Sequence, residues 1–274
     1  MNKYFAAGNK AVSSRFARRN VENSVSYILP VLNSLPPPFT FLDVGCGPAS
    51  ITIDIAQRYP SSTVMGVDRA EAIEEARENA SKAGVSNVRF AVGDALQLAA
   101  AADTPGFEAV RGGCDVVHTH QLHMHVPDSL ALMRQLRLAA KPRGGYVCCR
   151  EADLGSATFS PATRAIESLA RMSEIRLKDP YVGGKLKQHA VAAGFKEENC
   201  STSVDTWLYD TPEQRRGWVE LVISSMPEKP TTEMPKEFQG LDLDQVRQAL
   251  RDWADTQDAW YKLPCPQIVC RRDD

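Results

Sequence analysis

The sequence has no long apolar segment. None of its apolar runs approaches the roughly 18 residues that a transmembrane helix needs, and the N-terminus lacks the apolar core of a signal peptide. We therefore expect a soluble, cytoplasmic protein. An excess of one charge is also missing, since 32 basic and 34 acidic residues leave a formal net charge of −2. This balance gives no general attraction to nucleic acid or to an anionic membrane, although it is compatible with a local basic patch.

Paired cysteines with metal-ligand spacing are absent. The seven cysteines form no C-x-x-C pair, and most of them lie in apolar runs typical of strands. We expect no metal site, and free, buried thiols in a reducing compartment. The cysteines are Cys46, Cys114, Cys148, Cys149, Cys200, Cys265 and Cys270.

The composition is that of an ordinary globular protein. Hydrophobic residues make up 43% and charged residues 24% of the 274 residues, and no internal repeat or low-complexity segment is visible. This length suits one large domain, or one domain with a substantial insertion.

A short apolar strand followed by a glycine turn, FLDVGCGPAS at 41–50, organises the rest of the chain. Gly45 and Gly47 have no Cβ, so a flat ligand can lie directly against the backbone. Pro48 suits the first turn of the helix that the following pattern predicts. We expect several backbone N–H groups and the positive end of this helix to meet at the turn.

Asp43 lies at the carboxyl end of this strand, two residues before the first glycine. A carboxylate there repels a pyrophosphate and attracts an ammonium group. It therefore argues against reading GCGPAS as a degraded dinucleotide motif, G-x-G-x-x-G, with Ser50 in place of the third glycine. The alternative is that Asp43 only ties down the loop.

The D-x-G-x-G pattern at 43–47 resembles the S-adenosylmethionine (SAM) motif of class I methyltransferases. VMGVDRA at 64–70 is similar to a second strand ending in an acid. Its Asp68 follows Asp43 by 25 positions (68 − 43), close to the interval at which dinucleotide folds place their ribose-binding acid. The resemblance implies that SAM is bound by Asp43, Gly45, Cys46, Gly47, Asp68 and Arg69.

Three later segments extend the resemblance. FAVGDALQL at 90–98 is similar to the third strand, whose end is where the family binds adenine. CDVVHTHQLHMHVPD at 114–128 and AAKPRGGYVCCRE at 139–151 resemble the fourth strand with its turn and the turn into the fifth strand. The sequence departs from the family at Ala49, where a third glycine is usual; alanine is small, so we expect binding to survive. The further cofactor-binding residues implied are Gly93, Asp94, Ala95, His120 and Gln121.

The alternation of strands and helices over 39–151 predicts an α/β fold: a Rossmann-like, doubly wound, mainly parallel sheet with helices on both faces. The resemblance implies seven strands and an antiparallel C-terminal strand at about 260–271. We expect four parts: a helical N-terminal cap or lid at 1–38, a SAM-binding core at 39–208, a helical substrate-cover insertion at 209–258, and the last core strand with the C-terminus at 259–274.

The acceptor-binding residues are less defined. In related methyltransferases of ubiquinone and menaquinone biosynthesis, the segment before the core closes over the cofactor and substrate, which implies lid contacts from Tyr4, Phe5 and Arg15. Glu151 follows the fifth strand and is expected to face the pocket, or else to hold a loop by hydrogen bonds. Trp218 belongs either to the core or to the lining of an apolar acceptor cavity.

Four histidines within HTHQLHMH, at 118–125, are the candidates for acid–base chemistry. His120 ends the fourth strand, beside the expected sulfonium, and is the first candidate for a catalytic base; His123 is the second. His125 matches a family histidine that is commonly structural. A structural role for all four is the alternative, and a histidine metal site is disfavoured because only Asp128 is a nearby carboxylate.

The sequence therefore predicts a SAM-dependent methyltransferase that acts on a small-molecule acceptor, similar to the secondary-metabolite enzymes of the ubiquinone-biosynthesis-like group. Three alternatives stay open: an enzyme of the same fold that catalyses a cyclisation or rearrangement, a nicotinamide oxidoreductase, and a non-catalytic SAM-binding regulator. Neither the methylated atom (O, N, C or S) nor the oligomeric state follows from the sequence.

Overall fold

The structure is a computed structural model that describes residues 19–101, 105–107, 111–163, 166–167, 177–228, 240 and 242–274. The chain divides into two compact units. The first comprises Met1–Asp153, Lys178–Asp205 and Cys265–Asp274, and the second Leu154–Leu177 and Thr206–Pro264. The insertion expected at 209–258 lies within the second unit, which also takes in 154–177, a segment expected in the core.

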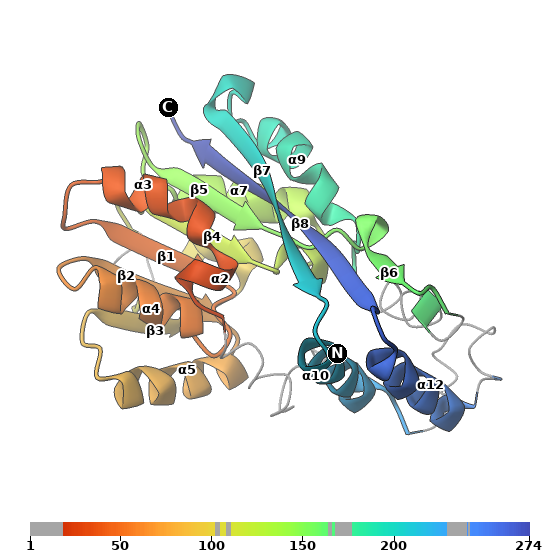
Figure 1. The fold of residues 1–274 in the computed structure, drawn as a ribbon. Helices are drawn as coiled ribbons and strands as arrows, with labels where there is room; N and C mark the ends of the chain where they lie inside the picture. Colours follow the sequence, from red (N-terminus) through yellow and green to blue (C-terminus); the bar gives the residue numbers. More distant parts are fainter. Residues whose placement is uncertain are drawn as a thin grey trace. The chain divides into compact units, whose positions relative to one another are not determined.

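Eight described strands form one sheet in the order β3-β2-β1-β4-β5-β8-β6, with β7 also paired to β8 (Figure 1). The first five strands are parallel, whereas β8 runs antiparallel to both β5 and β6. The strands are β1 (Thr40–Val44), β2 (Thr63–Asp68), β3 (Val88–Val92), β4 (Val116–His120), β5 (Tyr146–Arg150), β6 (Thr158–Ser160), β7 (Cys200–Tyr209) and β8 (Trp260–Arg271).

The strand order turns at β1, which lies between β2 and β4. In open α/β sheets, ligands bind beside the carboxyl ends of the strands at such a point. The predicted cofactor residues follow the carboxyl ends of β1, β2, β3 and β4, so the topology brings them to one edge of the sheet.

The described helices connect these strands and flank the sheet. They are α2 (Val21–Ser24), η1 (Ser26–Ile28), α3 (Leu29–Ser34), α4 (Ser50–Arg58), α5 (Ala70–Ala83), η2 (Ala95–Gln97), α6 (Leu98–Ala101), η4 (His123–His125), α7 (Ser129–Ala139), η5 (Leu154–Ser156), η6 (Val182–Lys185), α9 (Leu186–Ala192), η7 (Glu197–Asn199), α10 (Pro212–Ser225) and α12 (Leu243–Asp255).

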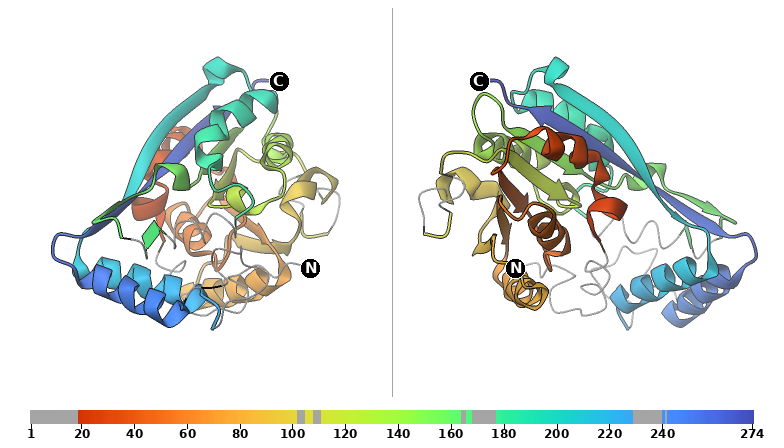
Figure 2. Two further views of the ribbon diagram at one scale, coloured as in Figure 1. Left: turned by 90° about the vertical axis from the view of Figure 1, so that its right-hand side faces the viewer. Right: turned by 60° about the vertical axis from the view of Figure 1, so that its left-hand side comes forward.

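The first unit has an apolar core on each face of its sheet. Strand residues alternate between the faces, so Leu42 and Val117 pack against α7 and α9, while Phe41 and Val116 pack against α2 to α5. Figure 2 shows α2, α3 and α4 together beside β1. The predicted parallel sheet with helices on both faces is confirmed.

The C-terminal end of α5 and the N-terminal end of α4 can be compared with the predictions made for Gly84 and Pro48. Gly84 ends α5 as expected, in the left-handed conformation (φ +68°), and donates its N–H to the carbonyls of Ala80 and Ser81. Pro48 does not occupy the first turn of α4, because that helix begins at Ser50. Pro48 instead belongs to the turn, and that prediction was wrong.

The C-terminal strand runs antiparallel, as the resemblance implied, and spans Trp260–Arg271. The predicted number of seven strands was too low. The missed strand, β6, has only three residues and pairs with the N-terminal part of β8. Such a short segment carries no periodic pattern that sequence analysis can detect.

The second unit has an aromatic core. The Trp218 ring lies 4.6 Å from that of Tyr261 and 5.9 Å from that of Trp253, centroid to centroid, and Phe159 stacks on Tyr261 at 4.3 Å. Trp218 is also buried. These contacts favour the core role for Trp218 over the lining of an acceptor cavity.

The composition led to expectations about thiols, membrane-spanning segments and metal sites, and the described residues bear on each of them. All seven cysteines are free thiols. No helix in the described ranges is long and apolar enough to cross a membrane. Within those ranges, no group of three or more histidine, cysteine, aspartate or glutamate side chains is arranged to hold a metal ion. Tyr4, Phe5 and Arg15 lie outside the described residues.

Arg215 of α10 is the buried polar centre of the second unit. Its guanidinium donates to the carbonyl oxygens of Ala254 (2.9 Å), Ala259 (2.7 Å) and Thr256 (3.0 Å), and also to that of Asp210. These carbonyls include the C-terminal end of α12, where a cation also compensates the negative end of the helix dipole.

We expect Arg215→Met to lower the free energy of unfolding of this unit by roughly 3–5 kcal/mol, because several buried carbonyls lose charged donors. Arg216→Met is the matched control. Arg216 pairs with Asp255 on the surface, and such pairs contribute about 0–1 kcal/mol. Urea unfolding followed by tryptophan fluorescence measures both. Equal stability of the two variants would contradict this role.

Candidate active site

The turn after β1 has three residues in the left-handed conformation. They are Gly45 (φ +76°), Gly47 (φ +54°) and Ala49 (φ +65°). Glycine adopts this conformation without steric strain, whereas alanine is strained by its Cβ. Ala49 stands where the family resemblance implies a third glycine. Its backbone has the left-handed conformation that glycine adopts easily, although the residue is alanine.

The N–H groups of this turn are bound within the protein. Gly45 donates to the carbonyl of Val67 at 2.8 Å and Cys46 to the same oxygen at 3.2 Å. Gly47 donates to Oδ2 of Asp68 at 2.8 Å. Several backbone N–H groups thus meet at the turn, as expected, but these three are already bound within the protein and are not offered to an anion. What remains for a ligand is the open space at Gly47, whereas the side chain of Leu122 packs against Gly45.

Asp68 ends β2 and is fixed from two sides. Oδ2 accepts the N–H of Gly47, and Oδ1 accepts the N–H of Arg69 at 2.7 Å. Burial raises the pKa of Asp68, while these two N–H groups act in the opposite direction. The carboxylate therefore joins the glycine turn to the end of β2 and stays partly exposed at the predicted ribose position.

Asp43 is only 3% exposed. Thr52 of α4 donates its hydroxyl to Oδ2 at 2.6 Å, and Nδ1 of His118 lies 2.8 Å from Oδ1. Both oxygens thus have protein partners, which favours the loop-tying alternative. Direct contact between Asp43 and a ligand ammonium stays a prediction.

The end of β3 completes this side of the site. The N–H of Gly93 donates to the carbonyl of Asp68 at 3.0 Å, and Asp94 caps the short helix η2 by accepting the N–H of Leu96 at 2.8 Å. A Cβ on Gly93 would lie 2.8 Å from the ring of Phe107. Glycine at 93 is therefore required for packing, besides its predicted place beside adenine; Ala95 follows in η2.

The carboxyl end of β4 combines a buried histidine with a strained residue. His120 is 7% exposed and is the last residue of the strand. Gln121 follows with φ +59°, an uncommon conformation for a residue with a Cβ. Its Oε1 accepts the N–H of Ala152 at 3.2 Å, and its Nε2 is buried with no hydrogen-bond partner in the described structure.

The surroundings of His120 keep its imidazole neutral. Its pKa is lowered well below the ordinary histidine value, first by burial and then by electrostatic interaction with Arg19, Arg150 and His118. His118 and His120 are stacked, with ring centroids 6.4 Å apart, because residues two apart on a strand share a face. A neutral imidazole is the form that accepts a proton.

Arg150 lies beside His120, and Tyr27 lies close enough to Arg150 to feel its charge; neither was identified from the sequence. Arg150 pairs with His120 in the register between β5 and β4, is fully buried, and donates to Oδ2 of Asp205 at 2.9 Å. The Tyr27 hydroxyl is buried without a hydrogen-bond partner among the described residues, and its pKa is raised by burial and by the nearby Cys148 and Cys149.

Alternation along the strands could have indicated Arg150, because it ends β5 beside the predicted His120. Tyr27 comes from the helical segment before the core, and only tertiary packing brings it to this place.

Glu151 is completely buried and shapes the turn after β4. Its Oε1 accepts the N–H groups of Leu122 at 2.7 Å and His123 at 2.9 Å. Burial raises the pKa of Glu151 to about 7. Oε2 is buried with no partner in the described residues. Glu151 thus holds the loop, the alternative role considered for it, and its contact with an acceptor stays a prediction.

His123 is also fully buried, and burial lowers its pKa to about 3. Its Nδ1 lies 2.8 Å from Oγ of Ser129. The pKa of His125 is lowered to about 4 by burial and by Arg19 and Arg69. Of the histidines considered for catalysis, His120 ends the strand itself, whereas His123 and His125 form the turn that follows.

Buried polar atoms without partners concentrate near this edge. Such atoms are uncommon in native proteins and often mark a ligand site. Those at the strand ends and in the following turn are Gln121 Nε2, His123 Nε2 and Glu151 Oε2, and the Tyr27 hydroxyl in η1 is a further one.

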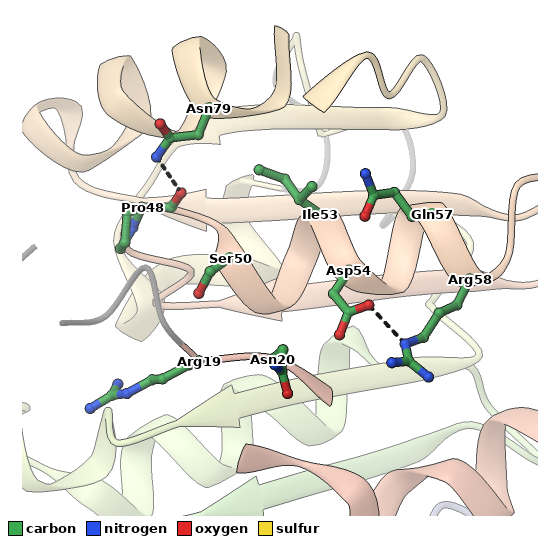
Figure 3. A pocket seen from close by; sticks show the side chains of 9 residues that line it. All are labelled: Arg19, Asn20, Pro48, Ser50, Ile53, Asp54, Gln57, Arg58 and Asn79. Atoms are coloured by element: carbon green, nitrogen blue, oxygen red, sulfur yellow. Dashed lines mark hydrogen bonds and ion pairs between the residues drawn. The ribbon is translucent and has the colours of Figure 1, made fainter. Parts of the chain in front are cut away.

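A cavity of about 430 Å³ lies behind the glycine turn, between the start of α2 and the exposed side of α4 (Figure 3). Asn79 donates to the carbonyl of Pro48 at 3.0 Å, and Arg58 pairs with Asp54. The charges lining the cavity are thus largely paired. Arg19, also in its lining, is one of the cations that lower the pKa of His120.

Comparisons with known proteins agree with this geometry. Residues 38–207 match the family described as "Methyltransferase domain". The chain is 32% identical over 228 residues to an uncharacterized methyltransferase of Schizosaccharomyces pombe, covering 79% of this chain and 77% of the relative. It is 25% identical over 201 residues to a trans-aconitate 2-methyltransferase of Methylobacterium radiotolerans, covering 73% and 70%.

The fold is also shared with solved structures. The Haemonchus contortus phosphoethanolamine N-methyltransferase 2, in complex with phosphomonomethylethanolamine and S-adenosylhomocysteine, aligns with a TM-score of 0.58 at 16% identity, covering 98% of this chain and 60% of that one. At such low identity the likeness shows the fold alone.

The raised pKa of Glu151 generates a prediction about stability. A glutamate titrates near 4.5 when unfolded and here at about 7 when folded. Between these values the folded state binds more protons, so its stability falls as the pH rises. Glu151→Gln keeps an Oε1 acceptor but does not titrate. Wild type should therefore lose up to about 3 kcal/mol relative to this variant between about pH 4.5 and pH 8.

Denaturant unfolding of wild type and Glu151→Gln at several pH values measures this difference in unfolding free energy. The contributions of the other titrating groups are common to both proteins and cancel. A constant difference across this pH range would show that the pKa of Glu151 is not raised.

Proposed function

We propose that this chain, which belongs to the methyltransferase domain family and has SAM as its cofactor, transfers the methyl group of SAM to a small-molecule acceptor bound at the carboxyl ends of β4 and β5. The finer assignment, to secondary-metabolite enzymes of the ubiquinone-biosynthesis-like group, is part of this proposal. The observation that carries it is the buried, neutral His120 between the cofactor turn and Arg150.

The occupied N–H groups of the glycine turn support SAM over a dinucleotide. A pyrophosphate at a glycine turn needs free backbone donors in that turn, but Gly45, Cys46 and Gly47 donate theirs to Val67 and Asp68. SAM has no phosphate and needs only close approach to the backbone. The same turn therefore disfavours the nicotinamide oxidoreductase alternative.

The residues present fit SAM at four places. Gly47 has open space where a Cβ would stand, and Asp68 has a rigid carboxylate that can accept ribose hydroxyls in addition to its present donors. Asp94 and the backbone after β3 would lie beside adenine. Gln121 Nε2, an unsatisfied buried donor, provides a polar contact near the end of β4.

SAM supplies a methyl group on a sulfonium, whose leaving group is neutral and needs no acid. The contribution of the chain is therefore to hold the acceptor in line and to exclude solvent. Burial of His120, Arg150 and the Tyr27 hydroxyl produces such a solvent-poor site. His120 would accept the proton of an O–H or N–H acceptor, because its lowered pKa keeps it unprotonated at neutral pH.

The N-terminal segment is proposed to close over the acceptor, with Tyr4, Phe5 and Arg15 as contacts. The influence of Arg19 on His120 supports this placement, since the segment reaches the site at its first described residue. A cyclisation or rearrangement on the same fold would use the same cofactor contacts, and a regulator would use them without turnover. Methyl transfer from labelled SAM to metabolite extracts separates these possibilities.

We expect Asp68→Ala to weaken SAM binding by roughly 1.5–3 kcal/mol, because charge-assisted hydrogen bonds to the ribose are lost. Glu71→Ala is the control, since Glu71 is an exposed acid three residues further on. Calorimetric titration of both variants and wild type with SAM, and of wild type with NAD, measures the effect. Unchanged SAM affinity in Asp68→Ala would place the ribose elsewhere.

We expect His120→Ala to lower turnover roughly 10²–10⁴-fold with little change in SAM affinity, as for other positioned bases. Since the pKa of His120 is well below the ordinary value, the wild-type rate should stay constant through neutral pH and fall only in acid. Steady-state rates with an acceptor found in the extract screen test both points. Turnover of His120→Ala within a few-fold of wild type, with the same pH profile, would assign His120 to shaping the pocket.

A further inference from the structure

A chain of three side chains leads from the turn after β4 to the surface of the first unit. Nδ1 of His123 lies 2.8 Å from Oγ of Ser129, and the same oxygen lies 3.0 Å from Nδ1 of His189. His123 is in η4, Ser129 begins α7, and His189 is in α9. Residues 66 positions apart in the sequence (189 − 123) are thus connected through one hydroxyl.

The two ends of this chain differ in their access to solvent. His123 is fully buried, and Ser129 is 8% exposed. His189 is partly exposed and lines a cavity of about 570 Å³ together with Ser129. Its lining includes the charged residues Asp128, Asp179 and Lys185.

Hydrogen bonding makes the two imidazoles depend on each other. A serine hydroxyl has one proton, so it can donate to only one of the two ring nitrogens and must accept an N–H from at least one of the rings. When His123 donates from Nδ1, its Nε2 is a bare lone pair and the serine donates to Nδ1 of His189. Nε2 of His123 is buried without a partner among the described residues. A buried N–H without an acceptor is rarer than a buried acceptor without a donor, which favours this arrangement.

We propose that His123, Ser129 and His189 form a relay that carries the acceptor's proton from the site to solvent. This inference rests on the proposed methyl transfer. The acceptor's proton, first taken up by His120, passes to Nε2 of His123 while the Nδ1 proton of His123 passes to Ser129. The serine proton passes to Nδ1 of His189, and the Nε2 proton of His189 leaves to solvent. One proton enters and one leaves, and each side chain ends neutral.

The relay resolves a difficulty at His123. Burial lowers its pKa to about 3, so it cannot hold a positive charge at neutral pH. In the relay it takes one proton as it releases another, and the charge passes to His189. The groups facing His189 are of both signs: Asp128 and Asp179 favour its protonation, and Lys185 opposes it.

The inner end of the relay belongs to the turn after β4, in η4. The N–H of His123 donates to Glu151, whose carboxylate also holds Leu122, and this turn directly follows His120 and Gln121. His120 and His123 then have successive roles: His120 is the first acceptor of the proton, and His123 is the group through which it leaves the buried edge.

The linkage can be tested without any acceptor. The chain has five histidines, so ¹⁵N-histidine labelling allows the tautomer of each ring to be followed by NMR from about pH 8 to pH 5. We expect His123 to carry its proton on Nδ1 at high pH. As His189 becomes protonated at both nitrogens, its Nδ1–H donates to Ser129, and His123 should change to the Nε2–H tautomer at the same midpoint.

Ser129→Ala should uncouple the two rings, so that His123 no longer responds to the titration of His189. Ser62→Ala is the control, because Ser62 is also a buried serine and accepts the N–H of Phe39, which is not part of the relay. If His123 does not respond in wild type, or responds equally in Ser129→Ala, no proton link exists and the relay is overturned.

The kinetic test uses added imidazole as the probe. With an acceptor found in the screen, His189→Gln should lower turnover roughly 10-fold or more, and imidazole, a diffusible base, should restore it through the cavity. SAM affinity should not change. A loss that imidazole does not restore would assign His189 a structural role. If wild type binds SAM but transfers no methyl group, the proposed function fails. The relay then also fails as an exit route for the acceptor's proton, even if NMR shows that the two rings are coupled.

Discussion

The buried carboxylate of Asp43 is the contact on which the cofactor edge depends. It accepts a hydrogen bond from Thr52 and pairs with His118, so one side chain at the end of β1 joins α4 and β4. A buried carboxylate is strongly disfavoured without partners, so these elements are held in one arrangement. The glycine turn is fixed in the same way from its other side, where Asp68 accepts the N–H of Gly47.

Because the turn is fixed by its own hydrogen bonds, its backbone is already in the conformation that a ligand meets, and binding need not order it. The acceptor side is organised differently. There Tyr27, Gln121 and Glu151 retain buried polar atoms without partners in the described residues, and Gln121 is strained. Strain and unsatisfied polar groups cluster at functional sites because function rather than stability selects them. We therefore assign cofactor binding to the hydrogen-bonded turn after β1, and the choice of acceptor to the residues with unsatisfied polar atoms.

Much of the first unit could be predicted from the sequence. The apolar runs around Asp43 and Asp68 and the glycine at 84 are local signals, and the strands and the helix end that they predicted are confirmed. The occupation of the turn's N–H groups could not be predicted, because it depends on the pairing of β1 with β2. Ser129 and His189 carry no local signal either, since only the packing of α7 on α9 brings them together.

A crystal structure with bound S-adenosylhomocysteine, the demethylated cofactor, tests the central claim most directly. We expect both ribose hydroxyls to lie within hydrogen-bond distance of Asp68, with that residue still bonded to Gly47 and the sulfur beside His120 and Gln121. A ligand held by the N–H groups of Gly45, Cys46 and Gly47, with Asp68 displaced, would contradict the account, as would a ligand bound away from the carboxyl ends of β1 and β4.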